Sequence, residues 1–339
     1  MAKPRAFITG ITGMVGSHLA EYLIEHTDWD VYGLARWRSP LDNIESLIPR
    51  INAKDRVFLL YGDLRDTLSI QEAVRAAAPD YVFHLAAQSF PRTSFDGPLD
   101  TLDTNVQGTV RVLDALKQHR RDAVIHVCSS SEVFGRVPRE KLPIDEECTF
   151  HPASPYAISK VGTDLVGRYY AEAFNMCTLV TRMFTHTGPR RGDVFAESTF
   201  AKQIAMIERN LIPPVVKVGN LNSLRTIADV RDAVRAYFML ATINPTPGAY
   251  YNIGGTHTVK VGEILDALLA LSPRRAEIRT EIDPERLRPI DADLQVPNTG
   301  KFTRHTGWKP EIPFDRTIRD LLDYWRNRVK REGDRFLRR

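Results

Sequence analysis

Two residues four positions apart carry the clearest chemistry in the chain. Tyr156 and Lys160 lie in the run SPYAISK, where Ser154 can cap a helix and Pro155 can occupy its first turn. Residues four apart share one face of a helix, so an ammonium there can stabilise a phenolate and lower the pKa of the tyrosine from about 10. The spacing therefore predicts a phenol that exchanges protons with a ligand, although such pairs also occur by chance on solvated helices.

A glycine-rich turn near the start of the chain predicts a cradle for phosphates. RAFITG is typical of a buried strand, and Gly10, Gly13 and Gly16 interrupt the passage into the amphipathic run HLAEYLIEH. Backbone N–H groups at a helix start lack intrahelical partners and favour an anion, and glycines let the backbone come close to it. With Met14 and Val15 in the same turn, the pattern predicts dinucleotide binding, and an ordinary strand-to-helix turn is the alternative.

The end of the next strand bears on the choice of dinucleotide. DVYGLA is followed by Arg36 and Arg38, where a cofactor with a free ribose 2′-hydroxyl is usually met by Asp or Glu. Two guanidiniums suit a 2′-phosphate instead. The sequence therefore predicts NADP, unless these arginines are simply solvated.

Further strands alternate with helices and end in small or polar residues. The runs RVFLLYGDL, DYVFHLAA and AVIHVCSSS are typical of buried strands, and ligands bind beyond the carboxyl ends of strands in open parallel sheets. This alternation predicts an α/β fold with a Rossmann-type doubly wound parallel sheet and a smaller α/β domain. The residues expected along the cofactor at this edge are Asp63, Leu64, Leu85, Ala86 and Ala87.

Over nearly its whole length the chain resembles the extended short-chain dehydrogenase/reductases of the NAD-dependent epimerase/dehydratase family, which act on nucleotide sugars. GITGMVG is similar to the family's cofactor loop, YGDL to its adenine contact and HLAAQS to the loop below the nicotinamide. SSSEVFG is similar to the catalytic serine strand and SPYAISK to the catalytic helix. Within the family, the chain is most similar to the GDP-mannose 4,6-dehydratases.

This resemblance implies roles for the polar residues. Tyr156 would take the proton of the sugar's C4 hydroxyl while hydride leaves C4 for NADP+, and Glu132 would then remove the acidified C5 proton. Loss of the C6 hydroxyl as water and return of the hydride to C6 would regenerate the cofactor. Ser130 would hydrogen-bond the C4 oxygen, and Lys160 would hold the ribose hydroxyls and keep Tyr156 acidic. Ser131 would help to protonate the leaving hydroxyl.

The resemblance also implies a GDP-sugar as substrate. Arg190 and Arg191 lie in PRRGDVF, and later arginines are expected on the nucleotide diphosphate. The full set expected to bind substrate is Ser89, Ser131, Thr185, Arg190, Arg191, Lys202, Arg225 and Arg288.

Other functions stay open at this point. A GDP-4-keto-6-deoxymannose reductase can carry a similar Ser-Ser-Glu, and Thr187-Gly188 is reductase-like, whereas the insert ARWRSPLDNIESLIPRINAKDRV is dehydratase-like and helps to build a tetramer in those enzymes. A nucleotide-sugar 4-epimerase would need no carboxylate at Glu132. A non-catalytic NADP-binding regulator would need no acid/base set at all.

The amino-acid composition excludes few classes of protein. In a chain of 339 residues, 26% charged residues and short apolar runs argue against a membrane protein, and a net charge of +4 is too mild to indicate nucleic acid. MAKPRAF lacks the features of a secretory signal, so a cytoplasmic location is expected. The three cysteines lack metal-ligand spacing, and neither a metal nor a disulfide is expected.

The chain is expected to form two domains. Residues 1–184 plus about 226–255 would bind the cofactor, about 185–225 plus 256–330 would bind the sugar nucleotide, and 331–339 would be a basic tail. The family resemblance implies a homodimer or homotetramer, with the Tyr156 helix in the dimer interface. His84 and His186 are expected to be structural hydrogen-bonding residues.

Overall fold

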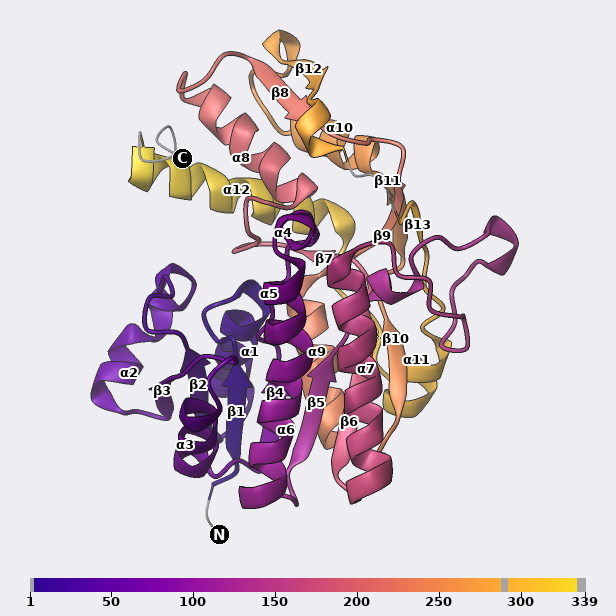
Figure 1. Cartoon of the computed structure of the whole chain (residues 1–339). Helices are drawn as coiled ribbons and strands as arrows, with labels where there is room; N and C mark the ends of the chain where they lie inside the picture. The colour runs from indigo at the N-terminus through magenta and orange to yellow at the C-terminus, as the bar shows by residue number, and fades with distance from the viewer. Residues whose placement is uncertain (1–2, 288–291, 334–339) are drawn as a thin grey trace.

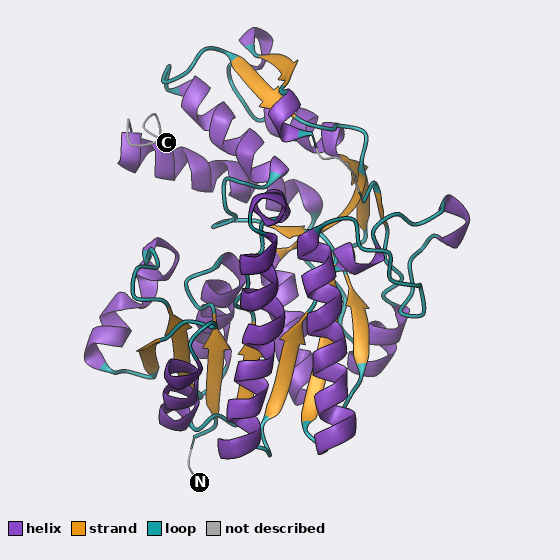
Figure 2. Cartoon of the chain, in the orientation of Figure 1, coloured by secondary structure: helices purple, strands orange, loops and turns teal. Residues whose placement is uncertain are grey.

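A seven-stranded parallel sheet forms the base of the molecule (Figures 1 and 2). The computed structural model describes residues 3–287 and 292–333. The strand order is β10-β6-β5-β4-β1-β2-β3, as expected for a Rossmann-type sheet. The strands are β1 (Arg5–Thr9), β2 (Asp30–Ala35), β3 (Val57–Tyr61), β4 (Tyr81–His84), β5 (Val124–Cys128), β6 (Cys177–Met183) and β10 (Tyr250–Ile253).

Helices cover both faces of this sheet, which is why its central strands are apolar along nearly their whole length. One face packs against α1 (Met14–His26), α9 (Val230–Thr242) and α11 (Gly300–Thr306). The other packs against α3 (Thr67–Ala77), α6 (Gly108–His119) and α7 (Pro155–Phe174). The fold class predicted from the sequence is confirmed.

Shorter elements connect the layers. The insert after β2 forms η1 (Asp42–Leu47) and α2 (Ile48–Ala53), and α4 (Pro91–Asp96), α5 (Pro98–Leu102) and η2 (Asp103–Gln107) lead into α6. After β5 come η3 (Ser131–Phe134) and η4 (Arg139–Lys141).

A second unit lies above the carboxyl ends of the strands (Figure 1). Its core is built from α8 (Ala196–Glu208), α10 (Val261–Ala270) and α12 (Phe314–Glu332), which pack on short strands. These strands are β7 (His186–Thr187), β8 (Val215–Val218), β9 (Leu224–Asp229), β11 (His257–Lys260), β12 (Arg279–Ile282) and β13 (Leu294–Gln295), with η5 (Arg275–Glu277) and η6 (Pro284–Arg286) between them.

Part of the chain expected in the second domain packs into the first instead. Phe302 and Trp308 are fully buried in the core between the sheet, α1 and α9. The Trp308 indole donates to the Asp232 carbonyl at 3.1 Å. Sequence order alone does not reveal that return. Of the expected basic tail, Arg331 still belongs to α12, and residues 334–339 lie outside the described ones.

The two predicted structural histidines are satisfied. His84 lies between the hydroxyls of Thr9 (2.9 Å) and Thr109 (3.1 Å), and burial lowers its pKa to about 3, so it stays neutral. His186 pairs through Nδ1 with the Phe184 carbonyl at 3.0 Å. Within the described ranges, no helix has the length and apolarity needed to span a membrane.

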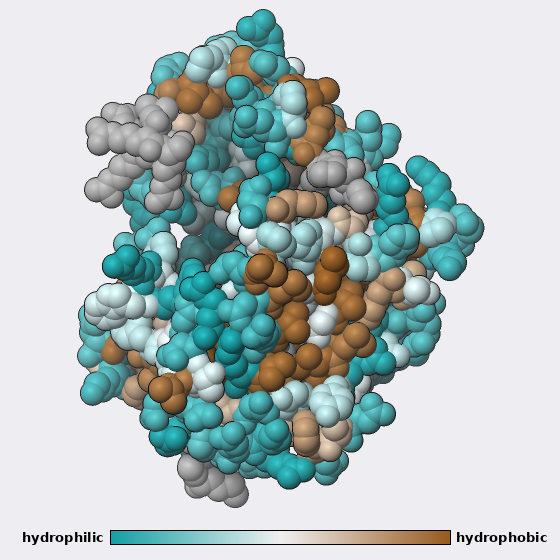
Figure 3. All heavy atoms as spheres, in the orientation of Figure 1, coloured by the Kyte–Doolittle hydropathy of each residue, from teal (hydrophilic) through white to brown (hydrophobic). Residues whose placement is uncertain are grey.

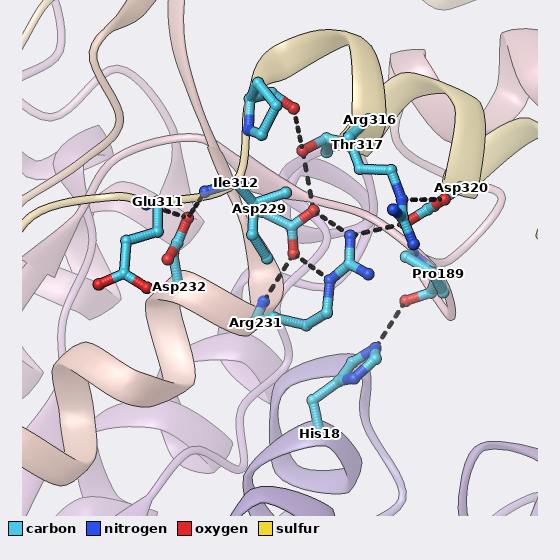
Figure 4. A network of polar contacts seen from close by, with 11 residues as sticks. His18, Pro189, Asp229, Arg231, Asp232, Glu311, Ile312, Arg316, Thr317 and Asp320 are labelled. Atoms are coloured by element: carbon cyan, nitrogen blue, oxygen red, sulfur yellow. Dashed lines mark hydrogen bonds and ion pairs between the residues drawn. The ribbon is translucent and has the colours of Figure 1, made fainter.

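A buried carboxylate joins the two units (Figure 4). Asp229 ends β9 and caps α9, accepting from the Arg231 backbone N–H at 2.8 Å and from the Thr317 hydroxyl of α12 at 2.8 Å. Arg231 bridges Asp229 (2.7 Å) and Asp320 of α12 (2.8 Å). These bonds connect the C-terminal helix with the helix that packs on the cofactor-binding sheet.

Replacement of this carboxylate tests the joint. Asp229→Ala leaves Arg231 and the Thr317 hydroxyl without their buried acceptor, and we expect the free energy of unfolding to fall by about 3 kcal/mol. Urea denaturation measures the change. Asp315→Ala, which removes an exposed acid in the first turn of α12, is the control and should change stability by about 0.5 kcal/mol or less. Equal effects of the two substitutions would contradict the role given to Asp229.

Candidate active site

A cavity of about 1930 Å³ lies between the carboxyl ends of the strands and the second unit. A pocket for one small ligand usually measures about 300–1,000 Å³, so this one has room for two ligands of nucleotide size. It lies beyond the carboxyl ends of β1 and β4, the neighbouring strands at which the strand order reverses and where ligands bind in sheets of this type.

The glycine turn forms the floor of the cofactor end. Gly10 has a φ of +78°, and a Cβ there would lie 3.0 Å from the Ala86 backbone. A Cβ at Gly16 would lie 2.3 Å from the Gly10 carbonyl oxygen. Gly13 precedes α1 as its N-cap with no side-chain cap, so the first N–H groups of α1 face the cavity without a competing oxygen. These residues fit a dinucleotide's pyrophosphate.

Most of the other predicted cofactor residues line the same cavity. They are Met14, Val15, Arg36, Asp63, Leu64, Leu85, Ala86 and Ala87. Arg38 does not line it, because the chain turns after Arg36 and leaves Trp37 exposed against Tyr61.

The adenine end contains a residue that sequence reasoning missed. Arg65 bonds Asp63 at 3.1 Å and Asp100 at 2.8 Å, and its hydrogen bond lowers the pKa of the Asp63 carboxyl. Arg36 adds a smaller effect in the same direction. Asp63 is thereby kept as an anion that can accept from a ligand's amino group.

Four predicted catalytic side chains meet at the centre of the cavity. Ser130, Glu132, Tyr156 and Lys160 all line it. The Ser130 hydroxyl accepts from the Glu132 backbone N–H at 3.2 Å, and the Ser130 side chain acts to lower the pKa of the Tyr156 phenol. These residues line one cavity because η3 follows directly after β5 and because α7 packs beside both elements.

The catalytic helix is anchored at its first turn. Ser154 caps α7 by accepting from the Ala157 N–H at 3.0 Å, as predicted, and Pro155 occupies the first turn. The Tyr156 N–H donates to the Ser94 hydroxyl of α4 at 3.0 Å. The tyrosine therefore enters the cavity from a fixed backbone.

The net shift of the Tyr156 pKa differs from the lowering that the sequence predicts, while the effect of Lys160 itself stays a prediction. Burial raises the pKa of the Tyr156 phenol instead of lowering it, and it also lowers the pKa of Lys160. The ammonium of Lys160 donates to the Cys128 carbonyl at 2.7 Å, so it is oriented towards β5. The sequence spacing correctly placed both residues on one face but could not show their desolvation.

The two adjacent arginines have different surroundings. Arg190 makes two bonds to Glu21 of α1, at 2.7 and 2.8 Å. Arg191 bonds Glu197 of α8 at 3.1 Å and lies 3.4 Å from the centre of the Phe195 ring. Glu197 was not expected in the site, since a lone glutamate early in a helix is usually only a favourable charge at its terminus.

The remaining predicted substrate residues divide into three groups. Ser89, Ser131, Thr185, Arg190, Arg191 and Arg225 line the cavity. Lys202 does not line it and pairs with Asp193 at 2.8 Å. Arg288 lies outside the described residues.

The glycine turn permits a test that separates folding from binding. Gly16→Ala places a methyl against the Gly10 carbonyl, so we expect a lower melting temperature and at least a roughly tenfold loss of NADP+ affinity. Gly13→Ala meets the same oxygen at a tolerable 3.2 Å and should keep the melting temperature within about 2 °C while still obstructing the phosphates. Calorimetry and cofactor titration measure the two effects. Full affinity in both variants would exclude this turn as the cradle.

Comparison with known proteins agrees with this geometry. Residues 7–321 match the family model of GDP-mannose 4,6 dehydratase. The chain is 32% identical to a GDP-6-deoxy-D-mannose reductase of Pseudomonas aeruginosa, over 97% of this chain and 99% of the relative. It is also 32% identical to GDP-mannose 4,6 dehydratase 1 of Arabidopsis thaliana, over 98% and 93% respectively.

A solved structure has the same fold. The structure of RMD from Pseudomonas aeruginosa complexed with NADPH superposes with a TM-score of 0.80 at 29% identity, covering 96% of this chain and all of that one. The glycine turn, the four polar side chains that line the cavity and these matches agree with one another. The chain belongs to the GDP-mannose 4,6-dehydratase family and has its Rossmann-type nicotinamide-binding fold.

Proposed function

We propose that the protein is a GDP-mannose 4,6-dehydratase that uses NADP and forms GDP-4-keto-6-deoxymannose. The observation that carries this proposal is the position of Glu132, a carboxylate that lines the same cavity as Ser130 and Tyr156. Its backbone N–H donates to the Ser130 hydroxyl at 3.2 Å, so the two residues are held together at the start of η3. Proton abstraction at C5 needs such a second base, which an epimerase or a binding protein does not.

The bound nicotinamide would supply a hydride acceptor for C4 of the sugar and later a hydride donor for C6. Tyr156 as phenolate takes the C4 hydroxyl proton while Ser130 hydrogen-bonds that oxygen. The ketone acidifies C5, Glu132 removes the C5 proton, and the same carboxyl then protonates the hydroxyl that leaves C6 as water. After C6 is reduced, the proton held by Tyr156 restores C5, and the site returns to its starting state.

Choice of NADP is supported by Arg36 at the ribose end and by the NADPH in the solved structure of RMD from Pseudomonas aeruginosa. Lys160 would hold the nicotinamide ribose. We propose that the sheet with its helices is the cofactor-binding domain and the upper unit the sugar-nucleotide domain, in a cytoplasmic enzyme. Thr185, Arg191 and Arg225 face the part of the cavity left for the substrate.

A GDP-4-keto-6-deoxymannose reductase is the second candidate. It is favoured by the similarity to the reductase of Pseudomonas aeruginosa, which is as high as that to the plant dehydratase. The two reactions differ in their cofactor balance. A dehydratase returns its hydride to the product, whereas a reductase consumes NADPH.

Mass spectrometry separates these functions. We expect loss of one water from GDP-mannose with NADP+ and no net NADPH, and no change in UDP-glucose, dTDP-glucose or CDP-glucose. Glu132→Gln should lower this rate about 100-fold or more, because it removes the base for C5. The matched control is Glu140→Gln, which changes an exposed acid in η4 and should keep the wild-type rate.

Several outcomes would count against the dehydratase. Folded protein that leaves GDP-mannose unchanged but oxidises NADPH with the 4-keto sugar would be a reductase. Water loss from a different nucleotide sugar would change the substrate but keep the mechanism. Full activity of Glu132→Gln would remove the role of that carboxylate.

The catalytic helix also supports a homodimer or homotetramer. Ile158, Leu165 and Tyr169 on the outer face of α7 are about half exposed, and Leu99 of α5 is 79% exposed. Figure 3 shows a hydrophobic area over these helices. A partner that buries this area would explain such apolar side chains on a surface.

Light scattering after size exclusion tests this interface. Leu165→Glu would bury a charge in it, so we expect a smaller particle than for the wild-type protein. Leu68→Glu changes a leucine of α3 that is 73% exposed, and it should leave the particle mass unchanged. An unchanged mass in Leu165→Glu would rule out α7 as the contact.

A further inference from the structure

Glu21 of α1 connects three segments that meet around the cavity. Its carboxylate accepts from both terminal nitrogens of Arg190, at 2.7 and 2.8 Å. It also accepts from the Ser46 hydroxyl of η1, in the insert after β2. Arg190 lines the cavity, whereas Glu21 does not. The carboxylate therefore holds the loop between β7 and α8 from outside the ligand site.

A second residue of α1 bonds the same loop. His18 lies one helical turn before Glu21, and its Nε2 donates to the Pro189 carbonyl at 3.1 Å (Figure 4). Burial and, to a smaller extent, the charge of Arg190 lower the pKa of His18 to about 4, so the ring is neutral near neutral pH. His18 and Glu21 thus fix two consecutive residues of the loop to the helix whose first turn forms the phosphate cradle.

The backbone at Arg190 has a conformation that needs such support. Its φ of +69° lies in the left-handed region, which costs a residue other than glycine about 1–2 kcal/mol. The Arg191 N–H closes the turn by donating to the Gly188 carbonyl at 3.2 Å. The bonds of Arg190 to Glu21 oppose relaxation of this turn, and strained backbone of this kind is found at functional sites. The position of the next residue, Arg191, depends on the same turn.

Arg191 keeps donors for a ligand, unlike Arg190. It lines the cavity, and its side chain is only 16% exposed. Within the described part of the chain it uses Nε alone for its ion pair with Glu197, at 3.1 Å. Its two terminal amino groups are left for a ligand, and a guanidinium suits the oxygens of a diphosphate. Arg190, in contrast, has both terminal nitrogens bonded to Glu21.

We propose that Glu21 is a positioning residue for the sugar nucleotide, and that it acts through Arg190 by holding the loop that presents Arg191 to the diphosphate. This replaces the substrate-binding role that the sequence predicts for Arg190. The inference rests on the proposed function only in taking the ligand to be a nucleoside diphosphate sugar.

Titration calorimetry with GDP tests the inference in protein saturated with NADP+. Glu21→Gln keeps the shape of the side chain but removes its charge, so we expect GDP to bind about tenfold more weakly. Arg190→Gln should have the same effect, and the double variant should lose no more than either single one, because the two residues act as a pair. Glu25→Gln changes an exposed acid of the same helix and should leave GDP affinity unchanged.

The sign of the change separates the two possible roles of Arg190. If Arg190 bound the diphosphate itself, Glu21→Gln would release its guanidinium, and GDP would bind as tightly as before or more tightly. That result would overturn the inference. Arg191→Gln removes the cation that the loop presents, so Glu21→Gln in that background should change GDP affinity by less than about twofold. A further loss of about tenfold in that background would also overturn it.

Cofactor binding distinguishes a moved loop from a damaged helix. A general disturbance of α1 would weaken NADP+ and GDP binding together, because the glycine turn leads into this helix. We expect Glu21→Gln to keep NADP+ affinity within about twofold, and equal losses for both ligands would refute the role of Glu21. Arg190→Lys keeps one charged donor and should recover part of the affinity that Arg190→Gln loses. In turnover of GDP-mannose, KM should rise while kcat stays within about twofold.

The outcome is independent of the catalytic assignment. A protein that leaves GDP-mannose unchanged but shows these changes in GDP affinity would refute the proposed function and keep the role of Glu21. Binding of UDP, dTDP or CDP instead of GDP, with the same loss in Glu21→Gln, would change the nucleotide and keep the inference. Folded protein that binds none of these diphosphates would overturn both.

Discussion

Burial of the Tyr156 phenol is the constraint on which the site depends. The phenol belongs to the first turn of α7, under the second unit, and Tyr156 is buried there. Desolvation also disfavours the phenolate that the chemistry needs. The surrounding residues have to offset that penalty, and the Ser130 hydroxyl and the Arg191 guanidinium act in this direction from two different parts of the chain.

The same constraint explains the two-part architecture. The sheet edge supplies the cradle, Ser130 and Tyr156, but it leaves them open on one side until α8 and α12 lie above it (Figure 1). Asp229 carries the connection between α9 and α12. The loop that contains Arg191 runs from β7 into α8, so the position of the second unit also decides where this guanidinium lies.

Weaker contacts than those of Asp229 lie along one part of the cavity. The insert after β2 lies against the C-terminal helix of the same chain, where Arg328 bonds Asp42 at 3.0 Å and Arg331 bonds Glu45 at 2.9 Å. Ion pairs as exposed as these contribute about 0–1 kcal/mol each. They are therefore weaker than the buried bonds of Asp229, which connect the two units.

Sequence alone determined the elements that depend on local rules. The glycine turn, the cap at Ser154, the alternation of strands and helices and the common face of Tyr156 and Lys160 all follow from backbone geometry and periodicity, and the structure contains each of them. Tertiary structure decided what depends on burial and on contacts between distant residues. It directed Arg190 to Glu21 and Arg191 to Glu197, returned Trp308 to the first core and raised the pKa of Tyr156. Desolvation and pairing energies are set by which groups meet in three dimensions, and the spacing of residues along the chain does not contain that information.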